Sequence, residues 1–191
     1  KKYKDIPVVS FGIEIPNTAS IVCKDKAGLK DVIRHLIDDH GSKKIIFVTG
    51  PINNADSLER FEAYREVLLE KNISYDENRV FHGDFVADTG YKIMEQIIHT
   101  NIEYDAIVFA NDSMALGAIK VIGNMKKTGI YPKDKQVIIC GFDNSIIARN
   151  SDPPLTTVKQ PISEMCTKAV ELLVKEDFKE ELIEFQSIMV K

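Results

Sequence analysis

Side chains that could hold a small molecule recur in this sequence directly after short apolar runs. Amides and carboxylates hydrogen-bond in fixed directions, and aromatic rings stack on apolar faces, so the combination suits a polyhydroxylated or heterocyclic ligand. An arginine near the start of a following helix can reach the same place with its long side chain. The six candidates for ligand contacts are Asn54, Arg60, Phe85, Asn111, Asp112 and Asp143.

Several of these residues also have plain structural explanations, which the sequence leaves open. Asp112 fits the N-cap of a helix before it fits a ligand contact, since aspartate is favoured at that position. Asp143 could form a turn with the two residues after it, and Phe85 could pack in the core. Asp56 and Asp88 are expected to be helix caps for the same reason as Asp112.

The sequence lacks the short motifs of common enzymes. It has no phosphate loop of the G-x-x-x-x-G-K-[ST] or G-x-G-x-x-G type, no H-E-x-x-H zinc motif and no G-x-S-x-G nucleophile elbow. Its four histidines are scattered, and His82 has no evident partner that would make it a base. We therefore expect a binding module with no cofactor and no metal, and not an enzyme. An enzyme that uses Asp143 or His82 as a base is a competing hypothesis.

Short runs rich in β-branched residues predict the strands that carry the candidate side chains. Each run is about as long as a buried strand and almost continuously apolar, as strands covered on both faces are. Polar side chains that follow parallel strands collect at one edge of the sheet, where the ligands of open α/β sheets bind. The predicted strands are 6–11, 20–23, 45–49, 106–110 and 137–141, with 79–82 as a weaker candidate.

Segments with helical periodicity separate these runs. One apolar stripe spans residues 32–37 and is ended by Gly41, and another spans residues 162–175. Three further helices are expected to open at the aspartates named above as caps. Strands that alternate with helices form right-handed βαβ units. We therefore predict an α/β fold with a doubly wound parallel sheet.

Composition and charge exclude several classes of protein. The chain of 191 residues has a formal net charge of −4, so it is not expected to attract nucleic-acid phosphates by itself. Its three cysteines lie far apart, which argues against a disulfide framework or a zinc site and suits a reducing compartment. The start does not resemble a signal peptide, and no apolar run approaches the roughly 20 residues of a membrane span. We therefore expect a cytoplasmic protein without membrane contact.

Three motifs in the second half of the chain resemble the effector-binding domain of the LacI family. They are ANDSMALG at 110–117, GFDN at 141–144 and PPLTTVKQP at 153–161. Shorter matches precede them in the same order, among them KIIFVTGP at 44–51 and GDF at 83–85. The resemblance covers nearly the whole chain.

This resemblance implies a binding domain of the periplasmic-binding-protein-like type I, with one complete lobe and part of a second. In the family, the residues at the positions of Arg60, Asn111 and Asp143 bind the effector, and the aromatic residue at Phe85 stacks on it. The resemblance implies that residues 20–158, joined by 182–191, form the C-terminal lobe. Residues 1–19 and 159–181 would then form part of the N-terminal lobe, and the effector would lie between the lobes.

Two departures from the family pattern bear on this interpretation. Family members have a longer N-terminal lobe, so about half of that lobe is expected to lie outside this chain. Several members also place an acidic residue near Gly12, and its absence here argues against a simple sugar-hydroxyl contact at that point.

The resemblance implies a small-molecule sensor of a LacI-family transcriptional regulator, with a sugar or nucleobase derivative as its effector. DNA would be bound only through a segment outside this chain, and a homodimer is expected from the family. The stretch 53–56 before Arg60 and the pair Ile15-Pro16 are also similar to LacI-type sensor modules of diguanylate cyclases and histidine kinases. That alternative stays open, whereas a secreted transport-binding protein fits least.

Overall fold

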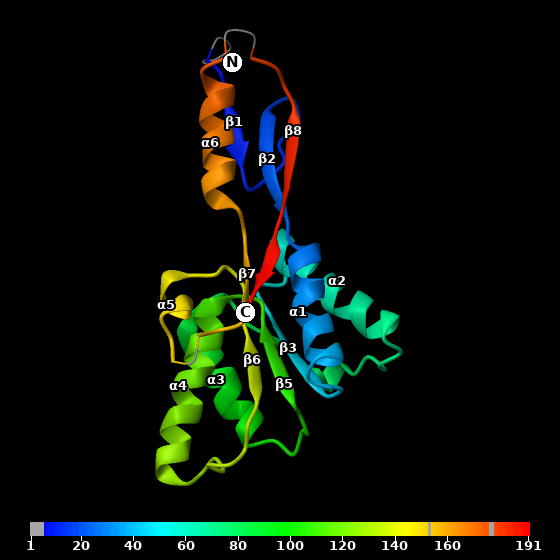
Figure 1. Ribbon diagram of the computed structural model, residues 1–191, viewed down its shortest axis with the longest axis vertical. Coiled ribbons are helices and arrows are strands. Elements are labelled where there is room, and N and C mark those ends of the chain that lie inside the picture. The colour runs from blue at the N-terminus through cyan, green and yellow to red at the C-terminus, as the bar shows by residue number, and fades with distance from the viewer. Residues whose placement is uncertain (1–5, 153, 176–177) are drawn as a thin grey trace. The chain divides into compact units, whose positions relative to one another are not determined.

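The computed structural model describes residues 6–152, 154–175 and 178–191, and the chain divides into two compact units (Figure 1). The smaller unit takes in the chain up to Lys24 and residues 160–187, and the larger unit contains residues 25–159 and 188–191. This division differs from the predicted one at the strands 20–24 and 182–186, which belong to the smaller unit. The reason is their mutual pairing, since each has its strand partners in that unit.

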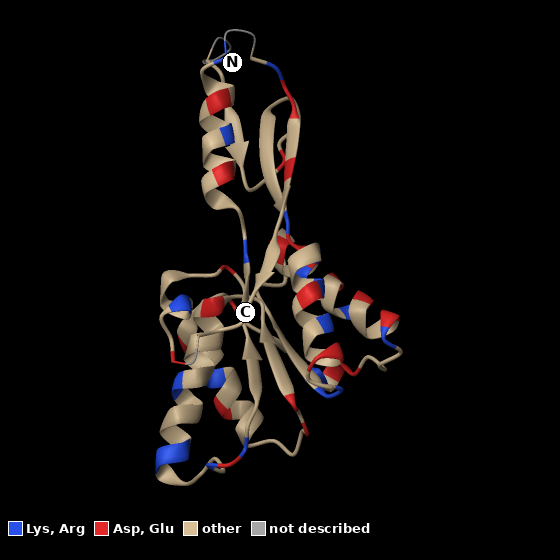
Figure 2. Cartoon of the chain, in the orientation of Figure 1, with Lys and Arg blue, Asp and Glu red and all other residues tan. Residues whose placement is uncertain are grey.

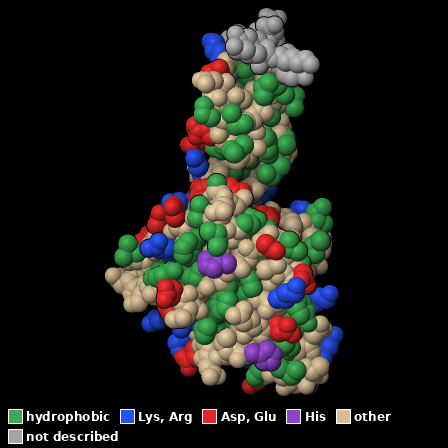
Figure 3. All heavy atoms as spheres, turned by 180° about the vertical axis from the view of Figure 1, so that it is seen from behind, with side chains coloured by type: hydrophobic (Ala, Val, Ile, Leu, Met, Phe, Trp, Pro, Cys, Tyr) green, Lys and Arg blue, Asp and Glu red, His purple; other side chains and the backbone are tan. Residues whose placement is uncertain are grey.

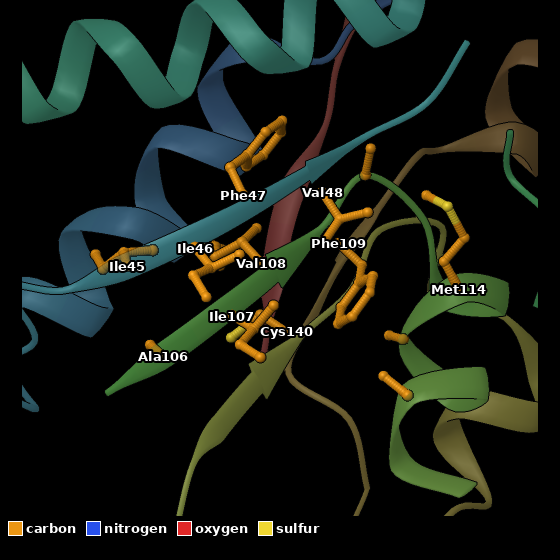
Figure 4. Packing of buried hydrophobic residues seen from close by; sticks show 14 of the residues in the cluster. Ile45, Ile46, Phe47, Val48, Ala106, Ile107, Val108, Phe109, Met114 and Cys140 are labelled. Atoms are coloured by element: carbon orange, nitrogen blue, oxygen red, sulfur yellow. The ribbon is translucent and has the colours of Figure 1, made fainter. Parts of the chain in front are cut away.

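The larger unit is built on a four-stranded parallel sheet in the order β4-β3-β5-β6. Every residue of the two central strands β3 and β5 is buried, as a parallel sheet covered on both faces requires. Figure 4 shows side chains of these strands, Phe109 among them, packed in the core with Met114 from the helix that follows β5. The strands are β3 (Ile45–Thr49), β4 (Val80–His82), β5 (Ala106–Phe109) and β6 (Ile138–Cys140).

Helices cover both faces of this sheet. The helices α1 (Lys26–Asp38) and α2 (Ala55–Glu70) pack on each other on one face, and α3 (Ala87–Ile98) and α4 (Asp112–Thr128) do so on the other (Figure 1). The predicted α/β class with a doubly wound parallel sheet is therefore confirmed. The remaining elements of this unit are the 3-10 helix Glu77–Arg79, α5 (Ile146–Arg149), and the antiparallel pair of β7 (Thr157–Lys159) and β9 (Ile188–Val190).

Two glycines allow α3 and α4 to approach each other closely. A Cβ atom on Gly90 would lie 2.1 Å from the backbone oxygen of Met114, and one on Gly117 would lie 2.0 Å from the backbone oxygen of Ala87. Real Cβ atoms do not come so near to backbone atoms, so any larger residue would force the helices apart. This close contact holds the start of α4, and with it the end of β5, against α3.

Ion pairs join the solvent-facing sides of α1 and α2, where Figure 2 shows both signs of charge. The Lys30 ammonium lies 2.5 Å from Glu66, and the Arg34 guanidinium lies 3.0 Å from Glu70. Because these side chains are partly exposed, each pair contributes at most about 1 kcal/mol to stability. The pairs add a small stabilisation to two helices whose buried faces already pack together.

The smaller unit has a three-stranded parallel sheet in the order β1-β2-β8, with α6 (Ile162–Leu173) packed on it. Its strands are β1 (Val9–Phe11), β2 (Ala19–Lys24) and β8 (Leu182–Gln186). The predicted strand 6–11 is too long at its start, where residues 6–8 lie outside β1. Apolar side chains remain on the surface of this unit, as Figure 3 shows from one side. Among the described residues, none of the helices has the length and apolar character to cross a membrane.

The three aspartates predicted as helix caps are not caps. Asp56 and Asp88 lie within the first turns of α2 and α3, and Asp112 is the first residue of α4. Asparagine caps a helix as well as aspartate does, and a carboxylate in the first turn is favoured by the positive end of the helix dipole. The caps in the structure are Asn54, Val86 and Asn111.

Candidate functional site

The chain reverses its direction across the sheet between β3 and β5. From β3 it passes through α2 to β4 on one side, whereas from β5 it passes through α4 to β6 on the other side. At such a reversal the loops leave neighbouring strands in opposite directions and open a crevice, in which open α/β sheets bind their ligands. The candidate residues on α2 and at the start of α4 lie at this edge of the sheet.

Arg60 is the most constrained of the candidate residues. It lies on α2 and is 4% exposed. Its Nε and Nη2 atoms donate to one carboxylate oxygen of Asp25, at 2.9 Å and 2.7 Å, and Nη1 donates to the carbonyl oxygen of Ala110 at 2.7 Å. Asp25 itself is 1% exposed, so the pair is a buried ion pair. The guanidinium is therefore held in one orientation before any ligand arrives.

Two aromatic rings lie beside this guanidinium. The ring centroid of Phe142 is 3.7 Å from Cζ of Arg60, and that of Phe85 is 5.7 Å away. Both distances are within the range of cation–π attraction. Phe85 has a positive φ of 69°, and a Cβ atom on Gly50 would lie 2.2 Å from its ring. Because Gly50 has no side chain, the Phe85 ring can lie beside Arg60. We call the edge of the sheet around Arg60 the rim.

Asp143 faces the same guanidinium from the loop after β6. Its Oδ1 atom lies 4.0 Å from Nη1 of Arg60, and its side chain is 41% exposed. Burial raises the pKa of this carboxyl to about 7, the Arg60 charge opposes that rise, and the carboxylates of Asp112, Asp25 and Asp56 add to it. Asp143 can therefore accept a hydrogen bond when ionised or donate one when protonated, near neutral pH.

Asp112 supports the loop that carries Asp143. Its two carboxylate oxygens accept hydrogen bonds from the backbone N–H of Ser145 at 2.7 Å and from the hydroxyl of Thr157 at 2.6 Å. Burial raises its pKa, and these hydrogen bonds oppose the rise. Because both oxygens are engaged within the protein, the geometry favours a positioning role for Asp112 over a direct ligand contact.

The two asparagine candidates are helix caps at the rim. Asn111 accepts from the N–H of Met114 at 3.0 Å and donates from Nδ2 to the carbonyl oxygen of Phe85 at 2.9 Å. Asn54 accepts from the N–H of Ser57 at 2.9 Å. Asn111 therefore links the start of α4 to the loop that bears the Phe85 ring. The structure brings Arg60, Phe85, Asn111 and Asp143 together and places Asn54 at the start of the helix that carries Arg60.

Sequence reasoning missed Asp25, the main partner of Arg60. Asp25 directly follows β2, so the rule of inspecting the residue after each strand would have found it there. It also precedes α1 as the N-cap, yet its side chain makes no cap bond to that helix. Thr157, which supports Asp112, gave no comparable signal because a buried hydroxyl has no characteristic spacing. His82 lies near the rim, with its Nδ1 atom 3.1 Å from the hydroxyl of Thr49.

A concavity of about 620 Å³ lies elsewhere on the larger unit, along the second half of α2 and the loop after it. It is lined by exposed side chains such as Leu69, which is 80% exposed, and by the charged Glu62 and Arg65. A ligand site combines an apolar wall with a few fixed and buried polar groups. The rim around Arg60 has such groups and the concavity does not, so we place the candidate site at Arg60.

Comparison with known proteins identifies the family to which this fold belongs. Residues 33–181 match the family described as Periplasmic binding protein-like domain. The HTH-type transcriptional regulator CelR of Thermobifida fusca is 33% identical over 147 residues, which are 77% of this chain and 42% of that protein. The HTH-type transcriptional repressor PurR of Vibrio atlanticus is 33% identical over 177 residues, 91% of this chain and 51% of that protein.

Solved structures show the same relationship. A sugar-binding transcriptional regulator of the LacI family from Escherichia coli, complexed with phosphate, superposes with a TM-score of 0.82 at 25% identity, covering 97% of this chain and 66% of that one. The chain belongs to the LacI family. A complex of the transcriptional regulator CelR with cellobiose matches this LacI-family chain with a TM-score of 0.79 at 27% identity, covering 96% and 57% of the two chains.

This LacI-family chain spans about half the length of the curated relatives it matches. All six candidate residues lie within the stretch that matches the domain family, whereas Asp25 lies before it. The relatives named are transcriptional regulators, which supports a regulator over a diguanylate cyclase or histidine kinase sensor.

Proposed function

We propose that this chain is the small-molecule sensing part of a LacI-family transcriptional regulator, with its ligand contacts at the rim around Arg60. The observation that carries the proposal is the buried Arg60 guanidinium, fixed by Asp25 and by the Ala110 carbonyl and flanked by Phe85 and Phe142. Two regulators that resemble the chain are named for a sugar ligand or for sugar binding, which supports the same assignment.

The charges at this rim favour a neutral, hydroxylated ligand. Arg60 is already paired with Asp25, and the carboxylates of Asp112, Asp25 and Asp56 lie near enough to Asp143 to raise its pKa. A phosphate or carboxylate would have to enter a site with more carboxyls than cations, whereas a hydroxyl can donate to Asp143. We therefore propose a sugar or an uncharged nucleobase derivative over a sugar phosphate.

Each side chain then has a distinct part in binding. The remaining N–H groups of Arg60 donate to ligand oxygens, Asp143 accepts from a ligand hydroxyl, and Phe85 covers an apolar face of the ring. Asn111 holds the Phe85 loop, and Asn54 orients α2. A ligand can switch the protein only if it binds one of two states more tightly than the other. Because these residues are held rigidly, the difference between the states has to come from ligand contacts that move.

A thermal-shift screen of the full-length protein tests the proposal. Paired ligands such as glucose and glucose 6-phosphate, or adenine and its nucleotide, separate the chemical class from the charge. A ligand at 100 times its Kd adds about 2.7 kcal/mol, or roughly 5–10 °C in Tm. Shifts with uncharged ligands that vanish in Asp143→Ala support the proposal. Shifts with phosphorylated ligands alone contradict the ligand class, and no shift across the panel contradicts the sensor.

We also propose that the parent protein is a homodimer that binds DNA through a segment other than these residues. The net charge of −4 gives residues 1–191 little attraction for phosphates. Exposed apolar side chains at the starts of α3 and α5, namely Val86, Ile146 and Ile147, are candidates for a surface between copies. Sedimentation of an Ile147→Glu variant as a monomer, against a dimeric parent, would support that surface.

A further inference from the structure

A pair of histidines lies at the end of α1, away from the residues assigned to the ligand site. His35 is on the last turn of α1, and its side chain is 11% exposed. His40 is exposed and follows in the turn that leads to β3, beside Gly41 with its positive φ of 69°. The Nε2 atoms of the two rings are 3.2 Å apart, and the rings are inclined at 77°.

A carboxylate fixes which nitrogen of His35 carries its proton. The Nδ1 atom of His35 lies 2.5 Å from Oδ2 of Asp39, and the ammonium of Lys191 lies 3.2 Å from the same oxygen. A carboxylate oxygen accepts hydrogen bonds, so Nδ1 of His35 is the donor in this contact. The Nε2 atom of neutral His35 is therefore left with a bare lone pair, directed toward His40.

This arrangement has the features of a metal-binding pair. Metal-bound histidines commonly donate their other N–H to a carboxylate, which orients the ring and raises its basicity. With Zn–N bonds of about 2.0–2.1 Å, two nitrogens 3.2 Å apart subtend an angle of about 100° at the ion, close to tetrahedral. We propose that His35 and His40 bind one zinc-type divalent ion through their Nε2 atoms, with Asp39 as the residue that orients His35.

Binding through both Nε2 atoms determines which ring nitrogens carry protons and which metals suit the site. Neutral His40 moves its proton to Nδ1 so that both Nε2 lone pairs face the ion, and no proton is lost from either ring. Two imidazoles suit zinc, nickel or copper, whereas magnesium prefers oxygen ligands. Within the described part of the chain, no group of three or more His, Cys, Asp or Glu donors could hold a metal, so the proposed site has two protein ligands, and water would have to fill its other positions.

Calorimetric titration of the full chain with zinc chloride tests this site. Cys166 is exposed and could bind zinc independently, so the titrations use a Cys166→Ser background. We expect one zinc per chain, no binding of magnesium, and loss of the zinc site in His40→Asn, whose side chain is exposed. Asp39→Asn should weaken binding about 10- to 100-fold, because it removes the orienting carboxylate.

His99→Asn is the matched control, since His99 is an exposed histidine at the end of another helix, α3. Its zinc affinity should equal that of the Cys166→Ser background. The site is refuted if that background takes up no stoichiometric zinc, if His40→Asn binds as tightly, or if His99→Asn loses as much affinity. None of these outcomes depends on binding of the effector, so the zinc site and the proposed sensing function are tested separately.

Discussion

The buried pair of Arg60 and Asp25 is the residue-level feature on which the candidate site depends. Removing one partner leaves an uncompensated charge in a site that is 4% or less exposed, which costs about 3–5 kcal/mol of unfolding free energy. We expect Arg60→Met and Asp25→Asn each to lose stability of this size in urea unfolding. The double variant should lose much less than the sum, because neither Arg60 nor Asp25 is then left charged without the other.

An exposed ion pair provides the control for this cycle. Lys92 and Asp88 lie on α3 with both side chains about 70% exposed, so Lys92→Ala should leave the free energy of unfolding almost unchanged. Strictly additive losses for the Arg60 and Asp25 variants would mean that the two side chains do not depend on each other. The pair would then not be what orients the guanidinium.

Asp143 makes the free energy of unfolding depend on pH. Because burial raises the pKa of its carboxyl, burial also sets the direction of this dependence. Its pKa of about 7 in the folded protein lies above that of an aspartate in an unfolded chain, so the folded state holds a proton that the unfolded state releases. The free energy of unfolding therefore falls as pH rises from about 4 to about 7. Asp143→Asn removes this contribution and tolerates the positive φ of 113° at this position.

Thermal unfolding of the two proteins between pH 4 and pH 8 measures the effect. The Asn variant should match the wild type at the acidic end and become progressively more stable relative to it up to about pH 7. A difference in Tm that stays constant across this range would show that the carboxyl is not perturbed. The comparison cancels the titration of groups that both proteins share.

At the level of elements, two glycines in the same helix should respond in opposite ways to alanine. Gly117 faces Ala87 across the contact of α3 with α4, where a Cβ atom would lie 2.0 Å from a backbone oxygen. Gly117→Ala should therefore destabilise the protein by at least about 1–3 kcal/mol. Gly123 is exposed on α4 with open space around its Cα, so Gly123→Ala should stabilise the protein by about 0.5–1 kcal/mol.

Urea unfolding of the two variants checks this contrast. The gain in helix propensity from glycine to alanine is common to both variants, so a difference between them reports the contact at Gly117. If Gly117→Ala stabilised the protein as Gly123→Ala does, the two helices would have room to separate. The loop between β5 and α4 would then be less tightly held than the structure indicates.

The strands of the larger unit were predictable from sequence, and the details of the rim were not. Runs such as 45–49 and 106–110 are apolar throughout because both faces of the sheet are covered, which leaves a clear signal. The caps were misassigned because Asn54 and Asn111 stand within two residues of aspartates with the same preference. Asp25 directly follows β2, but its pairing with Arg60 joins positions 35 residues apart, so the sequence does not show the ion pair itself. The assignment of the six candidate residues to a ligand site stays a prediction until a ligand is bound.

At the level of the whole molecule, the two units have very different cores. In the larger unit, β3 and β5 are buried at every residue. Among the described residues of the smaller unit, the buried core cluster consists of Ala19, Ile21, Met165 and Leu172, and apolar residues such as Ile13 and Val170 are 60% or more exposed. Regions with few buried apolar contacts open at lower free energy than a well-packed core.

Hydrogen exchange of the 191-residue chain should therefore show two levels of protection. Amides of β2 and β8 should exchange well before those of β3 and β5, although both pairs are hydrogen-bonded in parallel sheets. Because the backbone bonding is the same, the difference in protection reports the packing around each sheet. Mass spectrometry of peptides that cover the four strands, referenced to the unfolded chain, measures it. Equal protection would mean that the units unfold together, so that stabilisation of the larger unit by a ligand would also protect β2 and β8.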